Sequence, residues 1–550
     1  MRLIERRIGL LFAGFLLAFL VVVTRAFWLQ GVQGSQLATQ AVNQQTETVM
    51  VPGLRGSLLD RSGNLLASSE DAATIYATPY QVKKKPQAAK KIAAILDLKQ
   101  KEVLEALSEE SGFAYIAHKV PLTKAMKIEK LHLEGIGQLP DSRRVYPQGE
   151  MAGQVIGVIG SENTGLTGLE EGEESVLGGT DGERRVVRDA LGDPIRLETV
   201  KQAEDGEDIQ LTLDPVIQQK TEEVLAGVGE SYSPKGATAI VVDPRTSQIL
   251  AMANWPPVNP GEFEEASNEE LMNQATSLNY EPGSTFKAFT VAAALEEKLV
   301  TPTTEFTLAP QIRVADRTIE DAEERGTENM TVAQILAKSS NVGAVTIGLE
   351  VGEDKFSKWI EKFGFDKPTK VQFPNEEVGI VPKLSEWSGS TIGNVPIGQG
   401  IAVTPVQMIA AYGAIANRGV LIEPHLVDRV GNGERVQPVR RRVVSTKTAE
   451  EVRHMLREVV EEGSGTAAQV PGYRIAGKTG TAAKPDGAGG YSTSAYVASF
   501  VGFVPAKHPR LVILVTVDEP RGAIWGGVVA APAFAEIAKF ALQYLEIPPD

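Results

Sequence analysis

Residues 281–287 read EPGSTFK, and an apolar run, AFTVAAALEE, follows at residues 288–297. Proline and glycine end the preceding segment, so Ser284 falls in the first turn of a helix, where free backbone N–H groups and the positive end of the helix dipole gather. Lys287 lies three residues further on, on the same helical face. A lysine that is held beside a hydroxyl and partly desolvated has a lowered pKa, so it can accept the proton of the serine. The stretch therefore predicts a nucleophilic serine. The alternative is a helix cap followed by a surface lysine, because S-x-x-K is expected roughly once by chance in a chain of this length.

Two further short motifs follow this stretch. SSN at residues 339–341 ends a helical run at residues 332–338, although S-x-N alone is a weak signal with three other matches. KTGT at residues 478–481 occurs once and follows a strand-like segment at residues 473–476. Glycine there would let a substrate backbone approach an edge strand closely, and the lysine and hydroxyls would face an incoming carboxylate.

Histidine and cysteine offer little competing chemistry. The five histidines form neither H-x-x-x-H nor H-E-x-x-H, so a metal site or a Ser-His-Asp triad would need long-range assembly. The chain contains no cysteine, which excludes disulfides, thiolate zinc sites, iron–sulfur clusters and a cysteine nucleophile. We therefore expect neither a metal nor a cofactor.

Strand-like runs lie on both sides of the three motifs. Residues 237–242 and 248–254 are joined by the turn sequence DPRTS, which predicts a hairpin. Residues 495–505 and 511–517 form a second pair near the end of the chain, and helical patterns lie between the two pairs. This order predicts an α+β domain whose antiparallel sheet is closed by segments distant in sequence.

The N-terminal segment carries a membrane signal. Residues 8–24 are 17 uncharged, mostly apolar residues, close to the lower limit for a spanning helix. Three arginines precede the run, and by the positive-inside rule they hold the N-terminus in the cytoplasm. A cleaved signal peptide is the alternative, but Arg25 stands where a small-residue cleavage site would be. We expect an uncleaved single-pass anchor, with the remainder of the chain outside the cytoplasm.

Length and charge limit the remaining options. A chain of 550 residues suggests about two to four domains, and a formal net charge of −15 argues against a nucleic-acid partner. Residues 51–213 mix strand and helix signals without a titratable cluster that resembles a reaction centre. The predicted organisation is a cytoplasmic tail at 1–7, a transmembrane anchor at 8–28, an elongated non-catalytic pedestal at 29–213 and a catalytic domain at 214–550.

The order S-x-x-K, S-x-N, K-T-G matches the set shared by penicillin-binding proteins and class A β-lactamases. The resemblance is extended by RGSLLDRSG at 55–63, RVYP at 144–147, GLE at 168–170, LTLD at 211–214, GQG at 398–400 and TP at 404–405. Over nearly its whole length the sequence resembles the class B, monofunctional penicillin-binding proteins, which are bitopic D,D-transpeptidases that cross-link peptidoglycan. Leu59 and Ser62 are mild departures from the first pedestal motif. The resemblance implies a dimerisation-like pedestal and a transpeptidase domain with a central antiparallel sheet flanked by helices.

The resemblance also implies a role for each motif residue. Ser284 attacks the carbonyl of the D-Ala-D-Ala bond in a donor stem peptide, and Lys287 is the general base. Ser339 relays protons to the leaving group, Asn341 orients substrate and Lys287, and Lys478 supports Ser339 electrostatically. An amine of a neighbouring stem peptide then takes the acyl group, and β-lactams act as covalent inhibitors.

Substrate binding is implied for the KTGT motif. Thr479 and Thr481, on either side of Gly480, resemble the residues that hold the terminal carboxylate. The backbone N–H groups of Ser284 and Thr481 would form the oxyanion hole.

Several other functions share parts of this pattern. A β-lactamase would also need a deacylating carboxylate and is normally a smaller secreted domain. A β-lactam sensor normally has more membrane spans, a bifunctional class A enzyme needs a glycosyltransferase site, and a silent scaffold would not need intact motifs. Within class B, the length and the stretch GGVVAAP at residues 526–532 resemble the division type more than the elongation type. The resemblance implies a polytopic SEDS-type glycosyltransferase as partner.

Overall fold

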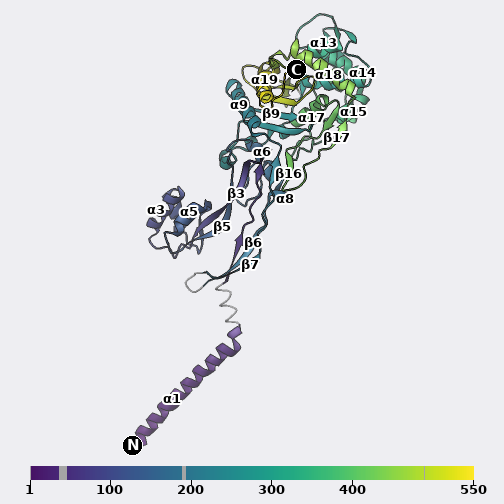
Figure 1. The fold of residues 1–550 in the computed structure, drawn as a ribbon. Coiled ribbons are helices and arrows are strands. Elements are labelled where there is room, and N and C mark those ends of the chain that lie inside the picture. Colours follow the sequence, from purple (N-terminus) through teal and green to yellow (C-terminus); the bar gives the residue numbers. More distant parts are fainter. Residues whose placement is uncertain (1, 36–45, 189–193, 488–489, 550) are drawn as a thin grey trace. The chain divides into compact units, whose positions relative to one another are not determined.

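The computed structural model describes residues 2–35, 46–188, 194–487 and 490–549. The chain forms two compact units (Figure 1). The first comprises residues 1–54, 70–143 and 179–205, and the second comprises residues 55–69, 144–178 and 206–550.

The first unit begins with a long exposed helix, α1 (Arg2–Phe27), which continues as a π-helical turn at Trp28–Val32. Within the described ranges, Ile4–Val32 is the one helical segment long and apolar enough to cross a membrane. Its length and composition are consistent with the predicted membrane anchor.

The rest of the first unit contains a small sheet and a helical lobe. The sheet has the antiparallel order β1 (Thr46–Val51), β6 (Gly182–Arg188) and β7 (Pro194–Lys201). In the lobe, β4 (Ala114–Pro121) pairs with the later part of β3 (Leu65–Ala77), and β5 spans Ile136–Val145. Helices α3 (Lys85–Leu96), α4 (Gln100–Ser108) and α5 (Leu122–Glu129) bury their apolar stripes in this lobe. The lobe therefore has a hydrophobic core of its own.

The second unit is built around a five-stranded antiparallel sheet. Its strands follow in the order β10 (Gln248–Trp255), β9 (Gly236–Asp243), β20 (Leu511–Asp518), β19 (Tyr491–Val504) and β18 (Ala476–Pro485). Strands from the two ends of the unit therefore lie side by side, and β18 is an edge strand. The predicted α+β fold and both predicted hairpins are confirmed.

Helices cover both faces of this sheet. Leu511 and Ile513 of β20 pack with α9 (Pro215–Tyr232) and α19 (Gly526–Tyr544), whereas Val512 and Leu514 join the core on the other face. Every residue of β20 is buried. A strand buried on both sides reads as a continuous apolar run rather than as an alternating one, which explains the sequence pattern.

The other face of the sheet is covered by a group of helices that includes those next to the S-x-x-K and S-x-N motifs. They are α12 (Lys287–Glu296), α13 (Val332–Ala337), α14 (Asn341–Val351), α15 (Glu353–Phe363), α17 (Pro405–Ala416) and α18 (Thr446–Glu461). Side-chain caps begin two of these helices. The Thr404 side chain, just before Pro405, accepts from the Gln407 N–H at the start of α17, and the Ser445 side chain accepts from the Thr448 N–H at the start of α18. Short antiparallel pairs, β11 (Glu305–Leu308) with β14 (Glu328–Thr331) and β12 (Gln311–Val314) with β13 (Arg317–Glu320), precede α13.

Segments from the first half of the chain also belong to the second unit. β8 (Ile209–Leu211) pairs in parallel with β2 (Leu58–Leu59) and antiparallel with β16 (Val427–Val430). The second unit also contains the short helices α6 (Gly153–Ile156), α7 (Gly168–Gly172) and α8 (Glu174–Leu177).

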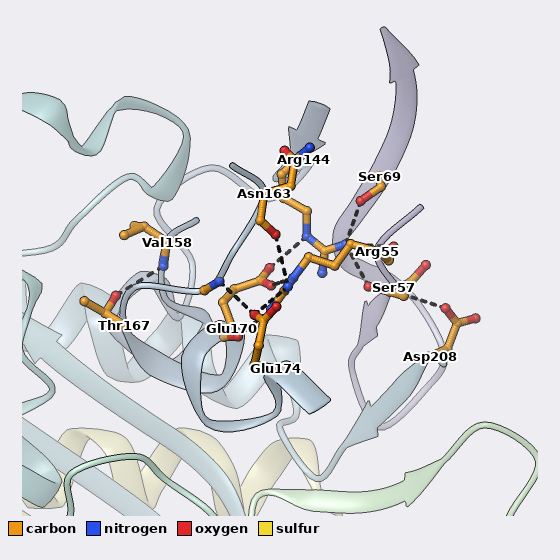
Figure 2. Close-up of polar contacts among 12 residues, drawn as sticks. Arg55, Ser57, Ser69, Arg144, Val158, Asn163, Thr167, Glu170, Glu174 and Asp208 are labelled. Carbon is orange, nitrogen blue, oxygen red and sulfur yellow. Dashed lines mark hydrogen bonds and ion pairs between the residues drawn. The ribbon is translucent and has the colours of Figure 1, made fainter. Parts of the chain in front are cut away.

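A buried ionic cluster joins three of the motifs quoted above (Figure 2). The Glu170 carboxylate, fully buried, accepts from Arg55 Nε at 2.5 Å and from Arg144 Nε at 2.8 Å. Arg55 also pairs with Glu174 at 2.7 Å, and Arg144 donates to the carbonyl of Gly56 at 2.7 Å. RGSLLDRSG, RVYP and GLE therefore each contribute to one charge-compensated cluster.

Candidate active site

Ser284 lies in a tight turn at the start of α12. A 3₁₀ turn, Gly283–Phe286, leads into α12 at Lys287, and the Ser284 side chain is partly exposed. Gly283 has φ +54° and donates its N–H to the carbonyl of Gly398 at 3.0 Å. A Cβ at Gly398 would lie 2.2 Å from the Gly283 carbonyl oxygen, so the GQG loop closely backs the serine turn. The Tyr412 hydroxyl of α17 donates to the Thr285 carbonyl at 2.8 Å and so ties the turn to α17.

Lys287 is buried and points at the second motif. Its Nζ donates to the carbonyl of Ser339 at 2.5 Å and to Asn341 Oδ1 at 2.7 Å, and lies 3.3 Å from Ser339 Oγ. The side chain is 1% exposed. Burial lowers the pKa of Lys287 to about 7, with a smaller opposing contribution from the carboxylate of Asp321. A large fraction of Lys287 is therefore neutral at neutral pH and able to take a proton.

Ser339 occupies a left-handed position, φ +60°, between α13 and α14. The Ser339 hydroxyl contacts both lysines, since Lys478 Nζ also donates to Ser339 Oγ at 2.9 Å. Asn341 begins α14 and donates its Nδ2 to the Glu320 carbonyl at 2.8 Å, which aims Oδ1 at Lys287. The structure thus brings together Lys287, Ser339, Asn341 and Lys478, as predicted, whereas the Ser284 hydroxyl makes no hydrogen bond with the residues that the structure describes.

Lys478 is fully buried within β18. Besides Ser339, its Nζ donates to the Thr479 carbonyl at 3.2 Å and to Ser464 Oγ at 3.5 Å. Burial lowers the pKa of Lys478 well below its ordinary value, and the positive charge of Lys287 lowers it further. The carboxylate of Asp321, whose charge acts on Lys287, pairs with Arg325 at 2.6 Å and accepts from the N–H of Val342 at 3.0 Å.

The KTGT motif lies inside β18 and not after a strand. The sequence predicted a strand at residues 473–476, but β18 begins at Ala476 and runs through the motif to Pro485. Gly480 is also required by the packing of the protein itself: a Cβ there would lie 2.3 Å from Ser499 Oγ and 3.0 Å from Thr285 Cγ2. Glycine is needed because β18 packs tightly against its own neighbours.

Thr479 and Thr481 border the open edge of β18. Their partners in the sheet lie on β19, where Thr479 faces Phe500 and Thr481 faces Ala498. Thr481 Oγ1 accepts from the N–H of Gly526, the first residue of α19, at 3.0 Å. The serine turn adjoins this edge, because a Cβ at Gly283 would lie 3.4 Å from the Thr481 carbonyl oxygen.

Two contributors were not predicted. Ser464, in the loop after α18, lies with its Oγ 2.9 Å from Thr479 Oγ1, and Asp321 accepts from the Ser340 hydroxyl at 3.0 Å. The one sequence signal for Ser464 is its position between two glycines directly after a helical run. Asp321 lies in no motif, and only the fold brings it to the start of α14.

A cavity of about 340 Å³ lies beside the serine turn. Tyr280 and Glu281, residues 400–402 and residues 482–485 line it. The Glu281 carboxylate accepts from the Gly400 N–H at 2.9 Å and from the Tyr491 hydroxyl at 3.1 Å. The cavity therefore lies between the segment that leads into the serine turn and the part of β18 that follows Thr481.

Comparison with protein families finds two matches. The family model of the penicillin-binding protein transpeptidase domain matches residues 237–539. That of the penicillin-binding protein dimerisation domain matches residues 50–211.

Individual proteins are similar over almost the whole chain. Stage V sporulation protein D of Bacillus subtilis is 33% identical over 548 residues, with 97% of this chain and 85% of that protein covered. Peptidoglycan D,D-transpeptidase FtsI of Escherichia coli is 30% identical over 558 residues, with 100% and 93% covered. The crystal structure of penicillin-binding protein 3 from Mycobacterium tuberculosis in complex with aztreonam gives a TM-score of 0.72 at 31% identity, with 91% of this chain and 98% of that chain covered.

Proposed function

Because the chain belongs to the class B penicillin-binding proteins, a family of peptidoglycan D,D-transpeptidases, we propose that it cross-links stem peptides through an acyl-enzyme on Ser284. The observation that carries this proposal is the Ser339 hydroxyl, which lies between two buried lysines, 3.3 Å from Lys287 Nζ and 2.9 Å from Lys478 Nζ. A hydroxyl in that position can pass a proton from one side of the site to the other.

Acylation begins with attack of Ser284 Oγ on the carbonyl of the penultimate D-Ala of the donor. Neutral Lys287 takes the hydroxyl proton, and the backbone N–H groups of Ser284 and Thr481 stabilise the oxyanion. When the C–N bond breaks, the proton travels from Lys287 through Ser339 to the departing D-Ala amine. An amine of a second stem peptide then attacks the ester and transfers its proton back along the same route, which restores the Ser284 hydroxyl.

Substrate would bind along the open edge of β18. An extended peptide can add to this edge as a further strand, with the hydroxyls of Thr479 and Thr481 near its carboxylate. The cavity beside Glu281 is of a size to take part of the donor chain.

The direct test is Ser284→Ala in the full chain. We expect complete loss of peptidoglycan cross-linking and of covalent labelling by a fluorescent penicillin. Ser277→Ala is the matched control, because Ser277 lies shortly before the serine turn and its hydroxyl donates to the Asn273 carbonyl at 2.8 Å. Persistent labelling of Ser284→Ala would reject Ser284 as the nucleophile.

We further propose that the enzyme acts at the division septum, beside a SEDS-type glycosyltransferase, with α1 in the membrane and the catalytic unit outside the cytoplasm. The stretch at residues 526–532, which resembles the division type, supports this role. It begins α19 and contacts the site through Gly526. A fluorescent fusion should concentrate at mid-cell, whereas a side-wall pattern would favour the elongation alternative. Protease protection of the N-terminal tail in intact cells tests the topology.

A further inference from the structure

A second cavity, of about 400 Å³, lies against α18, and its lining includes none of Ser284, Lys287, Ser339, Asn341 and Lys478. We call it the basic cavity, because its lining includes five cationic side chains, Arg418, Arg453, Arg457, Arg474 and Lys507. They come from four separate places: the turn after α17, α18, the segment before β18 and the turn between β19 and β20. Glu450 is the one carboxylate that lines the cavity with them. Such a concentration of positive charge is unexpected in a chain whose formal net charge is −15.

Two of these arginines are held inside the wall of the cavity. Arg453 and Arg457 lie four residues apart and so share one face of α18. Their side chains are only 11% and 29% exposed. The Nε–H groups of both are buried and make no hydrogen bond with any residue in the described ranges. Because these Nε atoms are buried, a ligand in the cavity would respond to the positive charge of the two arginines and not to their Nε–H groups.

The carboxylates nearby compensate for part of the charge. Glu450 forms an ion pair with Arg453 at 3.6 Å, and Glu461 forms one with Arg457 at 3.3 Å, so two carboxylates stand against five cations. Burial lowers the pKa of Arg453; the carboxylate of Glu450 opposes this shift, and the weaker repulsion from Arg418 adds to it. The cations therefore repel one another across a space that an anion could fill.

The chemistry of the lining identifies the class of anion. Guanidinium groups donate in a planar fork that matches the oxygens of phosphate, and several of them around one space suit an anion with more than one negative charge. A space of about 400 Å³ lies in the usual range for small-molecule sites. We propose that the basic cavity binds a phosphate-bearing anion.

The test is binding of three phosphate probes to the full chain reconstituted in phosphatidylcholine vesicles, measured at constant ionic strength. Inorganic pyrophosphate represents a free phosphate, poly(glycerol phosphate) represents a wall polymer, and vesicles with phosphatidylglycerol represent a lipid headgroup. We expect saturable binding of at least one probe, and the identity of the tightest probe distinguishes these sources. Absence of saturable binding for all three would overturn the proposal.

Two variants tie the binding to the cavity. Arg418→Gln/Lys507→Gln removes two exposed cations without disturbing the core, and we expect about tenfold weaker binding. Arg453→Gln tests the buried guanidinium, with thermal unfolding as the check on folding. Arg245→Gln/Arg435→Gln is the matched control, because both arginines lie outside the cavity. Equal affinity in Arg418→Gln/Lys507→Gln and the control, or tighter cavity-dependent binding of an acidic peptide than of every phosphate probe, would reject the assignment.

Discussion

The second unit contains two buried cationic clusters that are built in opposite ways. Around Glu170, Arg55 and Arg144 are paired with a fully buried carboxylate. Around Ser339, Lys287 and Lys478 contact hydroxyls, carbonyls and an amide, and neither forms an ion pair within the part of the chain that the structure describes. Arginine keeps its charge in any environment, whereas a buried lysine can lose its proton. The compensated cluster is therefore suited to holding chain segments together, and the uncompensated one to moving protons.

A permanent charge in place of Lys287 should disturb the uncompensated lysine cluster most. Lys287→Arg should reduce the rate of acylation by about a thousandfold, because the guanidinium cannot accept the serine proton. The second-order rate constant for labelling by a fluorescent penicillin measures this. Lys338→Arg, one residue before Ser339 on the exposed surface, is the control. A loss of less than tenfold for Lys287→Arg would contradict its role as base.

The opposite change removes compensation from the arginine cluster. Glu170→Gln should destabilise the second unit by about 3 kcal/mol, because two buried guanidinium groups lose their carboxylate. A lower Tm for the full chain would report this. Glu174→Gln is the control, since that side chain is 42% exposed and should contribute under about 1 kcal/mol. Equal Tm values for the two variants would mean that the cluster does not stabilise the fold.

A change of pH should act on the lysine cluster. The pKa of Lys287 is lowered to about 7, so its neutral fraction falls about tenfold for each pH unit below that value. The acylation rate should therefore rise with pH through about 7 and level off above it, with roughly a hundredfold difference between pH 5 and the plateau. A flat profile from pH 5 to pH 9 would show that Lys287 does not limit the reaction.

Ser464, which contacts Lys478 and Thr479, should have a small effect on the acylation rate. Ser464→Ala removes the hydroxyl 2.9 Å from Thr479 Oγ1, and we expect about a fivefold slower acylation, equivalent to about 1 kcal/mol. Ser388→Ala, at an exposed position, provides the control. Unchanged kinetics in Ser464→Ala would confine the functional cluster to the residues found from the motifs.

Sequence predicted the parts of this molecule that are local or periodic. The hairpin at residues 236–255 and the serine turn at residues 283–286 follow from turn residues and apolar runs. The contacts of Ser464 and Asp321 could not be predicted, because they depend on loops that are adjacent only in the folded chain. The same holds for the pairing of Arg55 with Glu170, which are 115 residues apart, although each lies in a motif found beforehand.

The position of β18 at the edge of the sheet has a consequence for solubility. An unpaired strand edge that can receive a peptide can equally receive a strand from another copy of the protein, which is the usual start of aggregation. Lys484 and Pro485, at the end of β18, are residues that discourage such pairing. The Lys484 ammonium is held at this end by Asp518 at 2.9 Å and by Glu519 at 2.6 Å. The strand thus stays accessible along the residues that we propose face substrate and is protected where they end.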